Sequence, residues 1–449
     1  MSVQTETAMD APQPRQVTMT LDEALAYGVK RHQAGDLDQA ETIYELVLSR
    51  HPERVEVVNF LGILKHQRGD LEGALALMRR VVECSPEADG AWNNLGNVLL
   101  ELDRDEEASE AFTRSIELVE TPQVWANLAR AGRRRGALDR SERACRRALE
   151  MDAGHGPATH NLALALLAQR RIDDGVAAAQ EAMQRLPLHE QRNSIYVRML
   201  LAAGEPAQAA VILRAWQALE PDNPYIDHQL AACTGQAAPE RASDAYVETV
   251  FDSFADSFET TLARLGYCAP ERVVAALAQA LPPPARQFDI ADLGCGTGLC
   301  GPLLQPWARR LVGCDLSAAM MARARGLGVY DDLQKVELTA FLDAHPEGFD
   351  VILSADTFVY FGDLQQAARS MRHALRASGH VAFSLEAMAA TEPGDHVLRA
   401  TGRYAHARDY VRRVLDEAGL RIHTIVGATL RQEALAPVAG WVVTASRIA

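Results

Sequence analysis

Residues 288–298 read Phe-Asp-Ile-Ala-Asp-Leu-Gly-Cys-Gly-Thr-Gly, an apolar run with an acid near its end that passes directly into three alternating glycines. The residues that follow are amphipathic, so the stretch predicts a strand, a tight turn and a helix in succession. Glycine is needed where a backbone turns sharply and a ligand must approach without a Cβ in the way. The stretch therefore predicts an α/β domain with a ligand-binding turn.

A second apolar run, residues 311–315, ends in Asp315. At the end of a second parallel strand, a carboxylate can accept both ribose hydroxyls of a bound nucleoside. The glycines at 296, 298 and 301 fit the G-x-G-x-x-G pattern of dinucleotide enzymes. The predicted strand nevertheless ends at Asp292, two residues before the first glycine, and Asp315 lies only fourteen residues beyond Gly301. A nicotinamide-dependent oxidoreductase thus stays open as a weaker alternative.

The sequence Asp-Leu-Gly-Cys-Gly-Thr-Gly at 292–298 is similar to motif I of class I S-adenosylmethionine-dependent methyltransferases. Residues 315–324 resemble that family's second strand end and the helix after it. Residues 330–338 resemble its third strand end, where an acid and a backbone amide usually address the adenine. Residues 349–356 match motif IV, whose end faces the transferable methyl group. The resemblance implies S-adenosyl-L-methionine as cofactor, held by Asp292, Gly294, Cys295, Gly296, Gly298, Asp315, Leu316, Glu337, Leu338 and Asp356.

Later apolar runs complete the family's expected sheet. Residues 380–385 read as the fifth strand, and 423–429 with 441–445 as a closing pair. The resemblance thus implies seven strands with an antiparallel last one.

Two further segments resemble bacterial methyltransferases that carry repeats. Residues 246–258 resemble an N-terminal helix that covers the cofactor, with Phe251 and Phe254 as candidate lid residues, although the phenylalanine spacing also fits core packing. In Gly-Arg-Tyr-Ala-His at 402–406, Tyr404 and His406 are predicted to flank the acceptor and, with Asp356, to form the catalytic set. His406 is a candidate base, against the alternative of a hydrogen-bonded structural histidine.

The first half of the chain repeats with a period of 34: Gly28, Gly62 and Gly96 are each followed seven residues later by a turn residue and twelve residues later by alanine. Such a period indicates stacked helical hairpins. The pattern resembles the tetratricopeptide repeat (TPR), with about six units over residues 21–222. The resemblance implies an α superhelix with a binding groove, followed in this chain by the Rossmann-like methyltransferase domain.

Asparagines recur at one position of three successive units, namely Asn94, Asn127 and Asn161. An amide offers a donor and an acceptor to a peptide backbone. The arrangement is similar to the asparagine ladder of the repeats in O-linked N-acetylglucosamine transferase, which implies a peptide groove. The structural alternative is that asparagine is common there in such repeats. Eight arginines crowd the fourth unit, and we interpret them as a solvated helix face rather than a carboxylate clamp.

The 449 residues include 45 Lys and Arg against 60 Asp and Glu, a net charge of −15, which disfavours general binding to nucleic acid or anionic lipid. The sequence has no apolar run long enough to span a bilayer and no secretory signal. Seven scattered cysteines without a C-x-x-C pair favour reduced thiols in the cytoplasm and no metal site.

The predicted organisation is a disordered tail over 1–19, a repeat array with a capping helix over 20–236, a linker with lid helices over 237–287, and the methyltransferase domain over 288–449. The predicted function is methyl transfer to a small molecule or a protein side chain, with the repeats recruiting a protein or peptide partner. The alternative is a non-catalytic scaffold whose Rossmann-like domain senses the cofactor.

Overall fold

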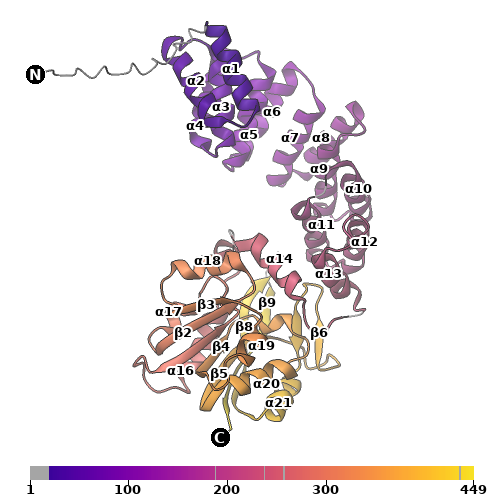
Figure 1. Ribbon diagram of the computed structural model, residues 1–449. Helices are drawn as coiled ribbons and strands as arrows, with labels where there is room; N and C mark the ends of the chain where they lie inside the picture. The colour runs from indigo at the N-terminus through magenta and orange to yellow at the C-terminus, as the bar shows by residue number, and fades with distance from the viewer. Residues whose placement is uncertain (1–19, 188, 237, 256–257, 434–435, 449) are drawn as a thin grey trace, which may run out of the picture. The chain divides into compact units, whose positions relative to one another are not determined.

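The computed structural model describes residues 20–187, 189–236, 238–255, 258–433 and 436–448. The predicted tail over 1–19 lies outside the described residues. Internal contacts divide the chain into two compact units, residues 1–187 and 188–449. Figure 1 shows the helices of the first unit and the sheet of the second.

The first unit consists of antiparallel helix pairs. The pairs are α1 (Leu21–Gln33) with α2 (Leu37–Arg50), α3 (Val55–Gln67) with α4 (Leu71–Cys84), α5 (Asp89–Glu101) with α6 (Asp105–Leu118), α7 (Pro122–Arg134) with α8 (Leu138–Met151), and α9 (Gly156–Ala168) with α10 (Ile172–Arg185). The turns inside the pairs contain a residue in the left-handed region, including Gly35 at φ 80°, Gly69 at 79° and Asp103 at 58°. The 34-residue period thus places one helical hairpin in each repeat.

Small residues let the paired helices approach closely. A Cβ on Gly96 of α5 would lie 2.5 Å from the Phe112 ring on α6, and Ala40, Ala74 and Ala108 are fully buried at the equivalent place in successive units. The repeat pattern read from the sequence is therefore the packing pattern of the array.

The second unit begins with three helices of the repeat type, α11 (Glu190–Ala202), α12 (Pro206–Gln217) and α13 (Pro224–Thr234). Three helices precede the sheet, α14 (Asp244–Phe254), α15 (Phe258–Arg264) and α16 (Ala269–Ala278). Helix α13 contacts α14, and His228 Nε2 of α13 donates a hydrogen bond to the Gly402 carbonyl at 2.9 Å. Helix α13, which matches the predicted capping helix, thus packs on the α/β domain, whereas the sequence placed a boundary at 236. The predicted domain limits remain a prediction.

A sheet forms the centre of the second unit. Its strands are β1 (Phe288–Leu293), β2 (Ala308–Asp315), β3 (Asp332–Lys335), β4 (Phe349–Ser354), β5 (Leu375–Ala387), β6 (His396–Leu398), β7 (Tyr404–His406), β8 (Leu420–Glu433) and β9 (Ala436–Arg447). The parallel order is β3-β2-β1-β4-β5, and β9 joins β5 antiparallel with β8 beyond it. The seven predicted strands are present, and a short hairpin of β6 and β7 adds two more.

Helices cover both faces of this sheet. They are α16 on one face, with α19 (Leu338–Asp343), α20 (Gln365–Ala374) and α21 (Arg408–Glu417) on the other, and α17 (Gly301–Leu304), α18 (Ala318–Gly326) and the 3-10 helix η2 (Phe358–Tyr360) in the connections. Successive residues of β4 enter opposite cores, Val351 and Leu353 beside α16 and Ile352 beside the other helices. The apolar runs of the sequence are therefore strands buried on both faces.

The described part of the chain contains no helix that is both long and apolar enough to cross a membrane.

Candidate functional site

A cavity of about 230 Å³ lies where β1, β2 and β4 end and α14 covers them. Parallel sheets bind ligands at the carboxyl ends of their strands, beside the point where the strand order reverses. Here the order reverses between β1 and β4. The predicted cofactor residues that line the cavity are Gly294, Gly296, Asp315, Leu316, Glu337, Leu338 and Asp356.

The glycine turn after β1 adopts backbone angles that favour glycine. Gly294 has φ 62° and Gly296 has φ 54°, in the left-handed region that L side chains avoid. A Cβ on Gly294 would meet Thr357 Oγ1 at 2.3 Å, whereas a Cβ on Gly296 would meet no heavy atom within 4 Å. The Gly296 backbone thus borders open space in the cavity, as a binding loop must.

Asp315, the last residue of β2, contacts the glycine turn. Its Oδ2 accepts a hydrogen bond from the Gly296 amide at 2.8 Å, and its Oδ1 accepts one from the Ser317 amide at 2.8 Å. Burial raises the pKa of Asp315, while these backbone hydrogen bonds oppose the rise. The carboxylate is therefore held in one orientation at the cavity wall.

Glu337 stands at the end of the third strand and caps α19. Its Oε2 accepts hydrogen bonds from the Thr339 amide at 2.8 Å and the Ala340 amide at 3.1 Å. Its Oε1 is buried and has no hydrogen-bond partner among the described residues. An orphaned acceptor at a cavity wall fits a ligand that supplies a donor, such as the amino group of adenine.

Three predicted cofactor residues, Asp292, Cys295 and Gly298, are not among the residues that line the cavity. Asp292 is 1% exposed and accepts a hydrogen bond from the Tyr330 hydroxyl at 2.6 Å; burial raises its pKa to about 7. The Cys295 amide donates to the Cys314 carbonyl at 3.0 Å, and Gly298 packs beside Tyr330. These residues shape the glycine turn from within the protein.

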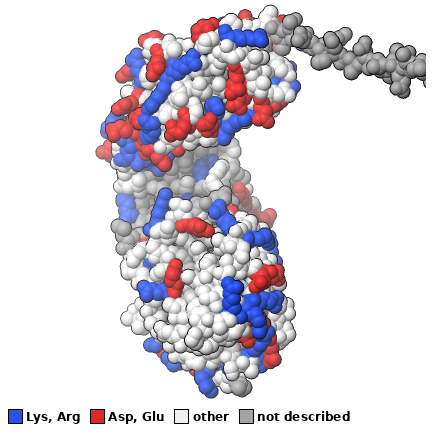
Figure 2. Space-filling model, turned by 90° about the vertical axis from the view of Figure 1, so that its left-hand side faces the viewer, with Lys and Arg blue, Asp and Glu red and all other residues white. Residues whose placement is uncertain are grey.

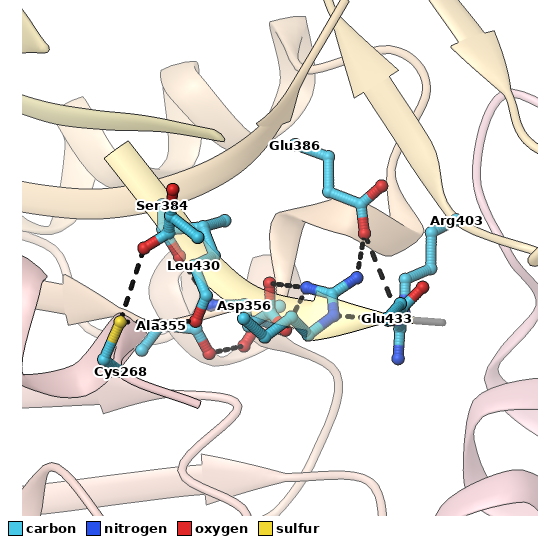
Figure 3. Close-up of polar contacts among 11 residues, drawn as sticks. Cys268, Ala355, Asp356, Ser384, Glu386, Arg403, Leu430 and Glu433 are labelled. Carbon is cyan, nitrogen blue, oxygen red and sulfur yellow. Dashed lines mark hydrogen bonds and ion pairs between the residues drawn. The ribbon is translucent and has the colours of Figure 1, made fainter. Parts of the chain in front are cut away.

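The far end of the cavity contains a buried network of charges (Figure 3). The Arg431 guanidinium of β8 contacts Asp356 Oδ2 at 3.0 Å through Nη1 and Glu433 Oε1 at 2.6 Å through Nε, and it also bonds Glu386. Arg403 contacts the same Glu433 oxygen at 2.5 Å. Burial raises the pKa of Glu386, although both arginines oppose the rise.

Asp356 occupies a strained position at this end of the cavity. Its φ of 60° lies in the left-handed region, and its amide donates to Ser384 Oγ at 2.8 Å. Strained backbone of this kind is concentrated at functional sites. Arg431 thus fixes a carboxylate that lines the cavity beside the strand-four end.

The structure does not bring Tyr404 and His406 to the cavity. Both are fully buried; the Tyr404 hydroxyl donates to the Pro239 carbonyl, and His406 Nε2 donates to the Gly362 carbonyl at 3.2 Å. Burial lowers the pKa of His406 to about 4. The side chain that reaches the cavity from this segment is Arg403, because side chains alternate along extended backbone. The hydrogen-bonded structural alternative fits His406 better.

Apolar side chains from the segment before the sheet line the rest of the cavity, Phe251, Phe254 and Phe258 among them. Asp252 Oδ1 accepts hydrogen bonds from Ser317 Oγ at 2.5 Å and the Ala319 amide at 3.3 Å, which fastens α14 beside α18. The segment predicted as a lid therefore forms a wall of the cavity.

Sequence reasoning missed Arg403, Arg431, Tyr267 and Tyr360 of the cavity lining. Arg403 belongs to the Gly-Arg-Tyr-Ala-His motif at 402–406. Because side chains alternate between the two faces of a strand, Arg403 is expected to face away from Tyr404 and His406, and this alternation is the signal that could have identified it. Arg431 carried no signal, because only the tertiary fold brings its side chain to Asp356.

The three asparagines of the array bond to the preceding repeat. Asn94 Nδ2 donates to Asn59 Oδ1 at 3.4 Å, Asn127 Nδ2 to Asn93 Oδ1 at 2.9 Å, and Asn161 Nδ2 to the Ala126 carbonyl at 2.9 Å. Asn127 and Asn161 are buried. This geometry favours inter-repeat fastening over free amides in a groove.

The fold is a TPR array followed in the chain by a Rossmann-like α/β domain. Residues 291–381 match the methyltransferase domain family, and residues 32–89 and 93–155 match the tetratricopeptide repeat family. The chain therefore carries a methyltransferase domain and TPR repeats.

Similar proteins include methyltransferases. Human Methyltransferase-like protein 27 is 37% identical over 105 residues, which cover 23% of this chain and 43% of that protein. The malonyl-[acyl-carrier protein] O-methyltransferase of Enterobacter lignolyticus is 30% identical over 142 residues, which cover 31% and 56%. The chain thus spans about half the length of these relatives.

A solved structure of an S-adenosylmethionine-dependent methyltransferase from Mesorhizobium loti is 24% identical. It covers 38% of this chain and 96% of its own, with a TM-score of 0.32.

Proposed function

We propose that the chain is an S-adenosylmethionine-dependent methyltransferase. The observation that supports this most is that the glycine turn, Asp315 and Glu337 line one cavity. The backbone of Gly294 and Gly296 would border the methionine end, Asp315 the ribose and Glu337 the adenine. The orphaned Oε1 of Glu337 and the open space beside Gly296 fit this cofactor. When bound, S-adenosylmethionine supplies an electrophilic methyl group.

The residues at the other end of the cavity would handle the acceptor, a small molecule or a protein side chain. Asp356, fixed by Arg431, would accept a hydrogen bond or a proton from it, and Arg403 and Tyr360 would orient it. The apolar wall from α14 would exclude water. One relative is named for O-methylation of a malonyl-[acyl-carrier protein], which makes an oxygen acceptor a reasonable first class to screen.

The TPR array would recruit a protein or peptide partner. None of the seven cysteines forms a disulfide. A cytoplasmic location remains the prediction made from their sequence pattern.

The test is calorimetric titration of the full chain with S-adenosylmethionine and, separately, with NADH. We expect saturable binding of the first only. Asp315→Asn should weaken that binding about 10- to 100-fold, because a hydrogen bond to a charged group contributes about 1.5–3 kcal/mol. Asp332→Asn is the matched control, since Asp332 is exposed on the neighbouring strand and lies outside the cavity. Binding of NADH alone would overturn the proposal.

Catalysis is tested separately from cofactor binding. Transfer of labelled methyl from S-adenosylmethionine into an extract-derived acceptor pool should require Asp356, so that Asp356→Asn abolishes it. If S-adenosylmethionine binds but no fraction is labelled by the unaltered chain, a cofactor-sensing scaffold becomes the better account.

A further inference from the structure

A second hollow lies in the first unit, among α6, α7 and α8, with a volume of about 480 Å³. Ile116, Trp125, Leu128 and Ala144 give it an apolar lining. Four arginines also line it, namely Arg135, Arg140, Arg143 and Arg147. No acidic residue is among the described residues that line this hollow, which we call the arginine groove.

The groove exists because one repeat lacks a large side chain. The eleventh residue of α5 is Leu99 and that of α9 is Leu166, and each is 2% exposed. The eleventh residue of α7, between them, is Gly132, which lines the groove. A Cβ on Gly132 would make only ordinary contacts, the nearest being Ser141 N at 3.5 Å. The missing leucine leaves space that the backbone does not fill.

The arginines of this repeat differ in their partners. On the face of the array that Figure 2 shows, basic and acidic side chains are interspersed. Several arginines of this repeat form ion pairs with acidic residues, namely Arg134 with Asp103, Arg135 with Glu106, Arg146 with Glu142, and Arg147 with Glu120. Among the described residues, the side chains of Arg140 and Arg143 make no hydrogen bond or ion pair. Both side chains are exposed, which agrees with the sequence interpretation of a solvated helix face.

The ion pairs at the groove are easily exchanged. Glu106, the partner of Arg135, is 72% exposed, and the partner Glu120 of Arg147 is 42% exposed. Surface pairs of this kind contribute about 0–1 kcal/mol each. All four guanidiniums are therefore available to an incoming anion at small cost.

We propose that the arginine groove binds an acidic peptide segment of a protein partner, with an apolar side chain seated on Trp125 and Leu128 and flanking carboxylates paired with the arginines. Guanidinium and carboxylate groups form paired, charge-assisted hydrogen bonds, and an apolar floor gives an anchor that charge alone does not supply. The chain's net charge of −15 disfavours a nucleic acid. This inference rests on the recruiting role proposed for the TPR array, for which it names the site and the partner's chemistry, and it is independent of the proposed methyl transfer.

The test uses the full chain and a fluorescein-labelled, amidated heptapeptide with a central leucine flanked on each side by two glutamates and capped by glycines. We expect saturable binding by fluorescence anisotropy that weakens at least about 10-fold when the leucine of the peptide is replaced by serine or its glutamates by glutamine. A ten-residue oligothymidylate should bind at least about 10-fold more weakly than the peptide.

Variants of the chain locate the site. Gly132→Leu restores the side chain that the neighbouring repeats carry and fills the groove, so it should weaken peptide binding at least about 10-fold while the array stays folded. Gly132→Ala is its matched control, because the added methyl fits and leaves the groove open; binding should remain. Arg140→Glu with Arg143→Glu should abolish binding, whereas Arg50→Glu with Arg198→Glu, exposed and outside the groove, should not.

The outcomes decide the proposal. It is overturned by absence of saturable peptide binding, by unchanged affinity in Gly132→Leu with native circular dichroism, or by equal affinity for the oligothymidylate. Cofactor titration of the same variants should be unchanged, which separates this result from failure of the methyltransferase proposal.

Discussion

The Asp315 carboxylate accepts a hydrogen bond from the Gly296 amide at 2.8 Å, so the end of the second strand holds the turn that follows the first. A carboxylate and a glycine nineteen residues apart thus form one wall of the cavity. The contact orients the carboxylate before any ligand arrives, and such preorganisation lowers the cost of binding.

Gly296→Leu should abolish tight cofactor binding. The added side chain enters the open space beside the loop, and a left-handed backbone strains any L residue by about 1–2 kcal/mol. We expect S-adenosylmethionine affinity to fall by at least about 100-fold, equivalent to about 2.7 kcal/mol, in calorimetric titration. Gly328→Leu is the matched control: Gly328 has φ 65° and equal space but lies outside the cavity lining. Equal losses of cofactor affinity in both variants would show that backbone strain, and not a side chain in the cavity, weakens binding.

Arg431→Leu should destabilise the second unit. The change leaves Asp356 without its cation and leaves Glu386 and Glu433 paired with Arg403 alone. Removing one partner of a buried ion pair costs about 3–5 kcal/mol. Urea unfolding measures this free energy. Arg413→Leu breaks a half-exposed pair with Asp395 and should cost less than about 1 kcal/mol. The buried network would be structurally unimportant if the two variants lost equal stability.

Asp292→Asn should change how stability depends on pH. An unfolded aspartate titrates near pH 4, whereas burial raises the pKa of Asp292 to about 7. The folded chain therefore binds more protons between these values, and the free energy of unfolding from this group is fully present below about pH 4 and lost as pH rises through about 7. An amide at this position does not ionise and still accepts from Tyr330.

The variant should accordingly be more stable than the unaltered chain at pH 8, by on the order of 2–4 kcal/mol. The difference should disappear below about pH 4. Thermal unfolding across pH 4–8 measures it, with the exposed Asp332→Asn as control. A pH-independent difference would contradict the shifted titration of Asp292.

Asn161→Ala should destabilise the array without changing peptide binding. The buried Asn161 amide donates to the Ala126 carbonyl of the preceding repeat, and loss of such a hydrogen bond costs about 1 kcal/mol. Asn94→Ala, whose bond to Asn59 is longer at 3.4 Å and less buried, should cost less. Thermal unfolding and the heptapeptide titration measure both effects. Loss of peptide affinity with intact stability would restore the peptide-ladder interpretation.

The sequence by itself determined the repeat array, the positions of the strands along the chain and the glycine turn. These features rest on local patterns: a period of 34, alternating apolar runs, and glycines at angles that other residues avoid. Asp315 could be predicted because it is the last residue of a parallel strand, and Glu337, two residues after β3, was predicted from the family resemblance.

Only the tertiary structure decided which polar groups share the cavity. Arg431 contacts Asp356, which lies 75 residues earlier in the chain, because the fold brings the end of β8 to the cavity. Side chains alternate along the extended segment at 403–406, so Arg403 faces the cavity whereas Tyr404 and His406 face the core. The arginine groove likewise depends on a side chain that Gly132 lacks between neighbouring helices. Local pattern fixes where elements begin and end, whereas the facing of a side chain and the space beside it depend on packing between elements distant in the chain.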